Sequence, residues 1–154
     1  MAELAIYENI TENENRYLVF SVKNEKFAFD ISNVNNIVQM EKIRPVPCAP
    51  KCYKGVINLR GDIIPVMSLH TKFNLGDDNI TSNSKIIILN VDENKQVGVI
   101  VDNVKEVLTI SNDEIEKPSP FLKKEESNVT GVSKVKDSLI SIIEVNSINR
   151  VGRI

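Results

Sequence analysis

The sequence predicts an all-β fold of two similar lobes, each a small barrel of about five short strands, packed around one shared core. Two observations lead to this prediction. Short runs of apolar residues alternate with polar ones and end at Gly, Pro or Asn turns. The order of these runs in the first half of the chain then repeats in the second half, about 70 residues further on. With 154 residues, 42% of them hydrophobic, the chain can bury such a core.

The first half opens with a predicted β-hairpin. RYLVFSV (16–22) alternates in polarity as a strand does, and KFAFDI (26–31) alternates again after a polar turn. Apolar residues then recur at intervals of three and four, which predicts a helical turn before a further short strand. These residues are Ile31, Val34, Ile37 and Val38.

Two more strands follow a proline-rich segment. GVINL (55–59) and DIIPVMSL (62–69) are joined at a tight corner, Arg60-Gly61, where Gly61 is expected to supply a positive φ. Proline cannot donate to a strand ladder, so Pro65 marks the second strand as an edge strand or a bulged one.

The second half repeats this order after a polar bridge (71–84). A strand, a charged turn and a strand come first, and apolar residues three apart follow. GVSKVKDSLISIIEV (131–145) then echoes GVINLRGDIIPVMSL (55–69), with Lys136 in the place of Arg60. The first set of predicted matches is Tyr17 with Ile87, Val19 with Leu89, Phe27 with Val97, Phe29 with Val99, Ile31 with Val101, Val34 with Val104 and Ile37 with Val107.

Composition bounds the domain organisation and the partners. Residues 1–15 are predicted to be a flexible tail, and 16–150 one domain with lobes at about 16–80 and 84–150. The net charge of −2, with both signs interspersed, offers no basic surface for nucleic acid or for an anionic membrane. The N-terminus lacks a targeting pattern, and no apolar run approaches a membrane span. We therefore expect a cytoplasmic protein without direct membrane contact.

The chain offers few residues for catalysis. Its one histidine, His70, lies in the polar sequence LHTKF and is interpreted as a solvated surface residue. Cys48 and Cys52 are too few for a disulfide framework and too close for an unstrained bridge, so they are expected to be reduced. A zinc site would need about two further ligands, and no phosphate-binding glycine pattern occurs. We expect no enzyme activity, cofactor, metal or small-molecule substrate.

Two other classes of function stay open as alternatives. A small β-barrel enzyme could use Cys48 or Cys52 as a reactive thiol. A β-barrel could also bind single-stranded nucleic acid, but such a protein needs a basic groove with stacking aromatics, and this chain has five Phe, three Tyr and no Trp.

Two exposed-looking positions are candidates for protein contacts. Arg60 either points to water from a tight turn or is held by a rigid corner beside an apolar surface, as interface hot spots require. Phe121, in KPSPFLKKEE, is either a ring folded over the end of the barrel or an exposed aromatic anchor. Ile43 and Arg44 occupy an approximately corresponding place in the first half.

In order and spacing, these motifs resemble the CheW family of bacterial chemotaxis coupling proteins. The resemblance runs from about residue 16 to 149 and is carried by YLVFSV, FAFDISNVNNI, YKGVINLRGDIIPVMSLHTKF, VGVIVDNVKEV and GVSKVKDSLISIIEVNSI. It implies a pair of five-stranded, SH3-like barrels without enzymatic activity. Such proteins bridge the cytoplasmic helical tips of chemoreceptors to the regulatory domain of the histidine kinase CheA, and are recruited through receptor arrays to the inner face of the membrane.

The resemblance also implies site residues. The receptor-binding groove would involve Ile31, Val34, Asn36, Gly55, Arg60, Gly61, Val104 and Val107. The kinase-binding surfaces would lie around Ile43 and Arg44 in one lobe and Phe121 in the other.

The sequence departs from the family pattern at a few positions. Asn36 stands where the family often has Glu, and Ser68 and His70 stand where an acid and a base are common. These changes bear on partner specificity and on any Asp-to-Arg pair at that place. The same pattern would fit a CheW-like regulatory module of a kinase or of a coupling-receiver protein, although the two ends of the chain favour a stand-alone protein.

Overall fold

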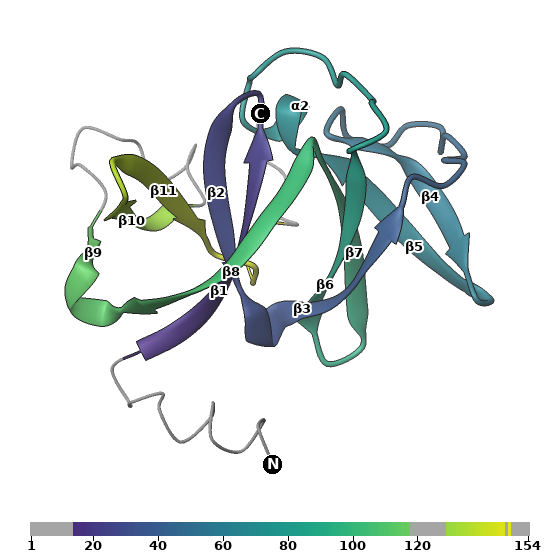
Figure 1. Cartoon of the computed structure of the whole chain (residues 1–154). Helices are drawn as coiled ribbons and strands as arrows, with labels where there is room; N and C mark the ends of the chain where they lie inside the picture. The colour runs from purple at the N-terminus through teal and green to yellow at the C-terminus, as the bar shows by residue number, and fades with distance from the viewer. Residues whose placement is uncertain (1–13, 118–128, 147, 149–154) are drawn as a thin grey trace.

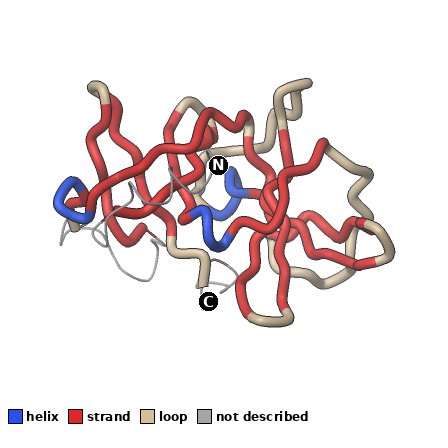
Figure 2. The backbone as a smooth tube through the Cα atoms, turned by 60° about the horizontal axis from the view of Figure 1, so that its bottom comes forward, coloured by secondary structure: helices blue, strands red, loops and turns tan. Residues whose placement is uncertain are grey.

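A computed structural model describes residues 14–117, 129–146 and 148, and these form two β-sheets with very little helix (Figure 1). The all-β prediction is confirmed. The longest helix in the described part of the chain is α2 (Leu69–Lys72), and the other helical segments are single 3-10 turns, η1 (Ile31–Asn33) and η2 (Asn112–Glu114). Figure 2 shows the two groups of strands side by side.

The six-stranded sheet has the order β8-β1-β2-β11-β10-β9. Its strands are β1 (Glu14–Val22), β2 (Glu25–Asp30), β8 (Asn103–Ser111), β9 (Ile115–Glu116), β10 (Val129–Val135) and β11 (Ser138–Ile143). The five-stranded sheet has the order β3-β6-β7-β5-β4. Its strands are β3 (Val34–Gln39), β4 (Tyr53–Leu59), β5 (Asp62–Ser68), β6 (Lys85–Asp92) and β7 (Lys95–Val101).

Each sheet takes strands from both halves of the sequence repeat. The first hairpin, β1 and β2, pairs with β8 and β11 of the second half, and the second hairpin, β6 and β7, pairs with β3 and β5 of the first half. The two parallel pairs, β11 with β2 and β5 with β7, are the counterparts of each other. The halves of the chain are therefore exchanged between the sheets.

One apolar cluster lies between the sheets, and each sheet curls around a smaller cluster of its own. Phe20 is fully buried in the shared cluster and stacks on Phe29, with ring centroids 4.7 Å apart. Leu18 and Phe20 face this shared cluster, whereas Tyr17 and Val19 face the cluster inside the six-stranded sheet. Because β1 is buried on both faces, it reads as a continuous apolar run.

This double burial explains one error in the predicted matches. Ile87 and Leu89 of β6 face the shared core, so their counterparts in β1 are Leu18 and Phe20, one residue away from the predicted Tyr17 and Val19. When both faces of a strand are apolar, the pattern of polarity does not show which residues point to which face. The extra residue lies at an irregularity in β6, between Asn90 and Asp92.

The hairpin corners agree with the repeat. Arg60 and Gly61 have φ values of 54° and 91°, and Lys136 and Asp137 have 48° and 66°. Two consecutive positive φ values are typical of the two-residue turns that match the twist of paired strands. The positive φ predicted for Gly61 is confirmed, and Lys136 repeats the position of Arg60.

The predicted helical turn before a short strand is confirmed as η1 followed by β3, but the turn ends at Asn33, so Val34, Ile37 and Val38 lie on the strand. In the second half, Val104 and Val107 lie on β8 with no preceding helical turn. β-branched side chains favour strands, and three-residue spacing over so short a run does not exclude one. Pro65 is not on an edge strand, because β5 lies between β7 and β4. Its pairing with β7 begins only at Val66, so the missing N–H disrupts no bond there, and the bulge lies in the facing strand β4.

Candidate protein-interaction site

A seam runs where the two sheets meet, and three predicted site residues lie on it. Ile31, Val34 and Val104 are half-buried and pack against the shared core. Val34 begins β3, an edge strand of the five-stranded sheet, and Val104 lies on β8, an edge strand of the six-stranded sheet. We call the outer face formed by η1, β3 and β8 the seam surface.

Local hydrogen bonds fix the start of this surface. The side chain of Asp30 accepts hydrogen bonds from the backbone N–H of Ser32 at 3.0 Å and from its hydroxyl at 2.8 Å. This N-cap holds η1, which turns the chain from β2 in one sheet into β3 in the other. Asn36 follows an irregularity in β3, and its side-chain oxygen accepts the N–H of Ile37 at 2.8 Å.

Apolar side chains on the seam surface come in equivalent pairs. Val107 is 42% exposed, and its repeat counterpart Ile37 is 38% exposed. Val34 and Val104 are a second pair on the same two strands, and both are half-buried. Ile37 was not among the predicted site residues, although the repeat already matched it with Val107 and could have identified it.

The Arg60-Gly61 corner lies at the same end of the five-stranded sheet as the start of β3. Val34 pairs with Leu89 near the end of β6, and β5 runs parallel to β7, so the corner lies beside the β6–β7 turn. Both corner residues are exposed, and Asn58 Oδ1 accepts the N–H of Gly61 at 3.0 Å.

A hollow of about 250 Å³ lies beside this corner. It is lined by Asp62, Ile63, Ile64, Asn90, Glu93, Asn94 and Gln96. Asn90 Oδ1 accepts hydrogen bonds from Gln96 Nε2 at 3.1 Å and from Asn35 Nδ2 of β3 at 3.4 Å. Polar contacts thus connect the hollow to the seam surface.

Gly55 does not lie with the other predicted receptor-binding residues. It is buried with φ +148°, and a Cβ there would overlap the carbonyl oxygen of Arg44 and lie 2.9 Å from Cγ2 of Ile43. Arg44 and Val56 exchange two backbone hydrogen bonds of 2.9 Å. The structure therefore places Gly55 beside Ile43 and Arg44, the residues predicted to face the kinase.

The second half contains the same arrangement at β9. Glu116 pairs with Val132, and a Cβ on Gly131 would overlap Cγ2 of Ile115. The structural counterparts of Ile43 and Arg44 are thus Ile115 and Glu116. Phe121, predicted for the second kinase-binding surface, lies outside the described residues.

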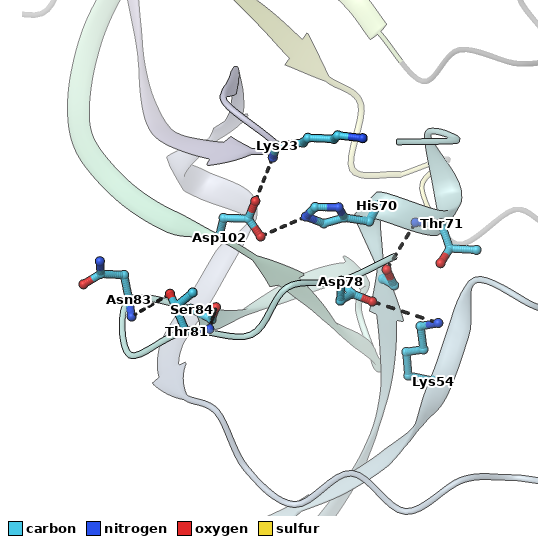
Figure 3. A network of polar contacts seen from close by, with 10 residues as sticks. Lys23, Lys54, His70, Thr71, Asp78, Thr81, Asn83, Ser84 and Asp102 are labelled. Carbon is cyan, nitrogen blue, oxygen red and sulfur yellow. Dashed lines mark hydrogen bonds and ion pairs between the residues drawn. The ribbon is translucent and has the colours of Figure 1, made fainter. Parts of the chain in front are cut away.

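The interpretation of His70 as a solvated residue is wrong. Its side chain is 3% exposed in α2, and Nε2 lies 2.8 Å from Oδ1 of Asp102 (Figure 3). The other oxygen of Asp102 accepts the backbone N–H of Lys23 at 2.7 Å. The polar neighbours of His70 in the sequence predicted exposure. The acid that pairs with it lies 32 residues further along the chain, so the local sequence contained no sign of the pair.

The described residues contain no group of three or more His, Cys, Asp or Glu placed to hold a metal ion. Cys48 is exposed, Cys52 is buried, and both are free thiols. Burial raises the pKa of Tyr53, and the neighbouring Cys52 adds to the rise. No helix in the described ranges is long and apolar enough to cross a membrane.

These features define a two-lobed all-β domain with a shared core and an apolar surface where the lobes meet. The profile of the CheW-like domain matches residues 16–151. The chain therefore belongs to the CheW family.

Individual relatives agree with this assignment. The chemotaxis protein CheW of Bacillus subtilis is 32% identical over 134 residues, which cover 86% of this chain and 85% of that protein. CheW of Treponema pallidum is 32% identical over 71% of this chain and 66% of its own length. The crystal structure of the scaffolding protein TtCheW from Thermoanaerobacter tengcongensis superposes with a TM-score of 0.82 at 33% identity, covering 93% of this chain and 92% of that one. The predicted SH3-like fold is thereby confirmed.

Proposed function

We propose that this chain is a non-enzymatic chemotaxis scaffold that couples chemoreceptors to the histidine kinase CheA. One surface would bind the cytoplasmic helical hairpin tip of a receptor, and another would bind the regulatory domain of the kinase. The protein would act in the cytoplasm and be recruited to the inner face of the membrane through receptor arrays. The names of the relatives and of the TtCheW structure support a scaffolding role in chemotaxis.

The observation that carries the proposal is the paired apolar pattern of the seam surface. Ile37 and Val107 are exposed, and Val34 and Val104 on the same two strands are half-buried. Apolar side chains spread over two strands suit the apolar face of a helix, which presents anchors about three or four residues apart. Arg60, exposed at a rigid corner at the same end of the sheet, would pair with a carboxylate or a carbonyl of the receptor.

Lys136→Ala is a matched control for Arg60→Ala. Both residues occupy the first position of the same kind of turn, with φ values of 48° and 54°, so alanine meets equal backbone strain at each place. We expect Arg60→Ala to weaken binding of a receptor cytoplasmic fragment by about 1–3 kcal/mol. Lys136→Ala should bind as wild type does.

The apolar part of the seam surface has its own control. Ile37→Asp and Val107→Asp should each abolish receptor binding while leaving the circular dichroism spectrum intact. Leu139→Asp, on a side chain that is 66% exposed in β11, should leave binding unchanged. Equal losses in all three variants would mean that the seam surface is not the receptor site.

Coupling itself is tested by CheA autophosphorylation with receptor fragment and kinase, in the absence of the protein, with wild type and with the variants. Wild type should stimulate the kinase strongly, and Arg60→Ala should not. Arg44→Glu should weaken binding to the CheA regulatory domain but not to the receptor, because Arg44 is exposed beside β4 on the predicted kinase side. A folded protein that fails to stimulate competent partners would refute the coupling function.

A further inference from the structure

The hollow beside the Arg60-Gly61 corner has an equivalent in the six-stranded sheet. The first lies where the β6–β7 turn meets the start of β5, and the second where the β1–β2 turn meets the start of β11. Because β5 runs parallel to β7 as β11 runs parallel to β2, both occupy the same place in the repeat. We call them the β5 hollow and the β11 hollow. The β11 hollow measures about 380 Å³ and is lined by Asn24, Glu25, Lys26, Phe27, Ser138, Leu139 and Ser141.

The hairpin registers set the residues of the two hollows against each other. Asp62 and Ser138 are each the first residue of a strand that follows a two-residue corner. The β6–β7 and β1–β2 turns are both two-residue turns as well, which aligns residues 93–96 with residues 23–26. The counterparts that differ in charge are Asp62 and Ser138, Glu93 and Lys23, Lys95 and Glu25, and Gln96 and Lys26.

In the β11 hollow, a cation of the chain itself occupies this place. Nζ of Lys26 donates to Oγ of Ser138 at 3.3 Å, so an ammonium group bridges β2 and β11. The β5 hollow has the opposite composition. Gln96 carries no charge, and the carboxylate of Asp62 stands in the place of the Ser138 hydroxyl. The place that holds a cation in one sheet therefore has a stronger acceptor in the other, without a cation of its own.

The negative charge of the β5 hollow is not compensated from within the described part of the chain. Asp62 and Glu93 are exposed and are the charged residues of its lining. Neither forms an ion pair with a described residue. The neighbouring cations, Arg60 on the corner and Lys95 on the turn, do not line the hollow. A positive group from outside the chain would thus meet two carboxylates.

The rest of the lining suits one long basic side chain. Ile63 is 62% exposed and offers an apolar wall, against which the methylene stem of an arginine or a lysine can pack. Gln96 donates through its Nε2 to Asn90, so its Oε1 is left as a further acceptor. At about 250 Å³ the hollow is smaller than the pockets of about 300–1,000 Å³ that enclose small-molecule ligands. A single side chain is therefore the fitting occupant.

The β5 hollow is continuous with the seam surface. Asn90, which lines the hollow, accepts a hydrogen bond from Nδ2 of Asn35 on β3 at 3.4 Å. β3 carries Val34 and Ile37 of the seam surface. A helix that lies on the seam surface can therefore extend a long side chain past Asn35 into the hollow.

We propose that the β5 hollow is a binding site for one basic side chain, arginine in preference to lysine, of the receptor's helical hairpin. The inference rests on the proposed coupling function and names the receptor chemistry that this site selects. A guanidinium group forms forked pairs with carboxylates, and Asp62 and Glu93 supply them. Arg60 lies outside the hollow, where it meets a carboxylate or a carbonyl of the receptor. The domain then selects a receptor surface that carries both signs of charge.

Two variants test the site. Asp62→Asn removes one carboxylate and keeps the shape of the side chain. Gln96→Lys builds the arrangement of the β11 hollow into the five-stranded sheet, because its ammonium group can reach Asp62. Binding of a receptor cytoplasmic fragment is measured by isothermal titration calorimetry, and folding is checked by circular dichroism.

We expect Asp62→Asn to weaken binding about fivefold and Gln96→Lys about tenfold or more, because like charges brought together at an interface are costly. Both losses should shrink when the salt concentration rises from about 50 mM to about 500 mM. Asp77→Asn is the matched control, since it removes the same charge from an exposed position on the loop after α2. Lys26→Gln removes the ammonium group of the β11 hollow. Both controls should bind as wild type does.

The partner side chain is identified by replacing each arginine and lysine at the tip of the fragment in turn by glutamine. One replacement should weaken binding to wild type about fivefold and should not weaken binding to Asp62→Asn any further. The absence of any such replacement would overturn the proposal. Should Gln96→Lys fail to fold, Asp62→Asn and this scan decide the question.

The failure of this site can be distinguished from the failure of the coupling function. If wild type binds the fragment and Ile37→Asp does not, while Asp62→Asn binds as wild type does, the assignment of the β5 hollow is wrong and coupling stands. A folded wild type that does not bind a competent receptor fragment would refute both.

Discussion

Replacing Gly55 by alanine should damage this domain far more than replacing Gly61. Both glycines have positive φ values, +148° and +91°, so an alanine is strained at either position. At Gly61, however, an added Cβ meets no described atom within 4 Å. Its cost is then the backbone strain alone, about 1 kcal/mol.

At Gly55 the added Cβ has no room. It would overlap the carbonyl oxygen of Arg44, lie 2.6 Å from the carbonyl carbon and contact Ile43. Backbone cannot move aside as a flexible side chain can, so the 43–44 segment must leave β4. Its two hydrogen bonds with Val56 are worth about 0.5–1.5 kcal/mol each. Together with the strain, we expect Gly55→Ala to cost about 2–4 kcal/mol.

Urea denaturation of wild type, Gly55→Ala and Gly61→Ala, followed by circular dichroism, measures this difference directly. A loss in Gly55→Ala no larger than that in Gly61→Ala would refute the reasoning, because it would mean that the 43–44 segment does not press on β4 in solution. Binding to the CheA regulatory domain adds a second measurement. Gly55→Ala should weaken it, since Arg44 is displaced, whereas Gly61→Ala should leave it unchanged.

Other predictions concern buried side chains and the exchange of strands between the sheets. Ser133→Ala should raise the free energy of unfolding by about 1 kcal/mol in urea denaturation, because the buried hydroxyl of Ser133 has no hydrogen-bond partner among the described residues. Phe20→Ala should lower it by about 3–5 kcal/mol, since this ring is fully buried and stacks on two others. Burial raises the pKa of Tyr53, so the folded state keeps its proton where the unfolded state loses it; the associated stability is complete below about pH 10 and falls as the pH rises further. Wild type should therefore lose more stability than Tyr53→Phe between pH 9 and pH 11, and an equal loss would contradict this. A fragment of residues 14–80 should show the circular dichroism of an unfolded chain, because its strands belong to two different sheets.

Much of the fold could be predicted because turns and apolar runs are local signals. The Arg60-Gly61 corner and its repeat at Lys136 follow from two-residue turn chemistry, and the hairpins on either side follow from alternation. The phase of β1 against β6 could not be predicted, because both strands are apolar on both faces. The exchange of strands between the sheets could not be predicted either, because local patterns do not determine which distant strands pair.

The candidate site could be predicted only in part, because it also depends on long-range strand pairing. Val34, Val104 and Val107 lie together on the seam surface because repeat counterparts occupy equivalent edge strands, and the same rule identifies Ile37. Gly55 belongs to the same sequence motif as Arg60, yet it admits the Arg44 carbonyl at the other end of β4. Closeness in the sequence therefore did not predict closeness in space, because β4 separates the two residues to opposite ends of the sheet.

The exchange of strands explains why a surface at the seam can affect the whole domain. β3 belongs to the five-stranded sheet and β8 to the six-stranded one, and both pack residues of the seam surface against the same core cluster. A helix bound across them would contact both sheets at once. Each sheet contains strands from both halves, so neither can shift without moving strands that continue into the other. Because close-packed interiors transmit strain and do not absorb it, displacement at the seam would reach the distant Ile43–Arg44 and Ile115–Glu116 edges. In the proposed coupling function, the shared core would carry such a displacement from the receptor side of the domain to the kinase side.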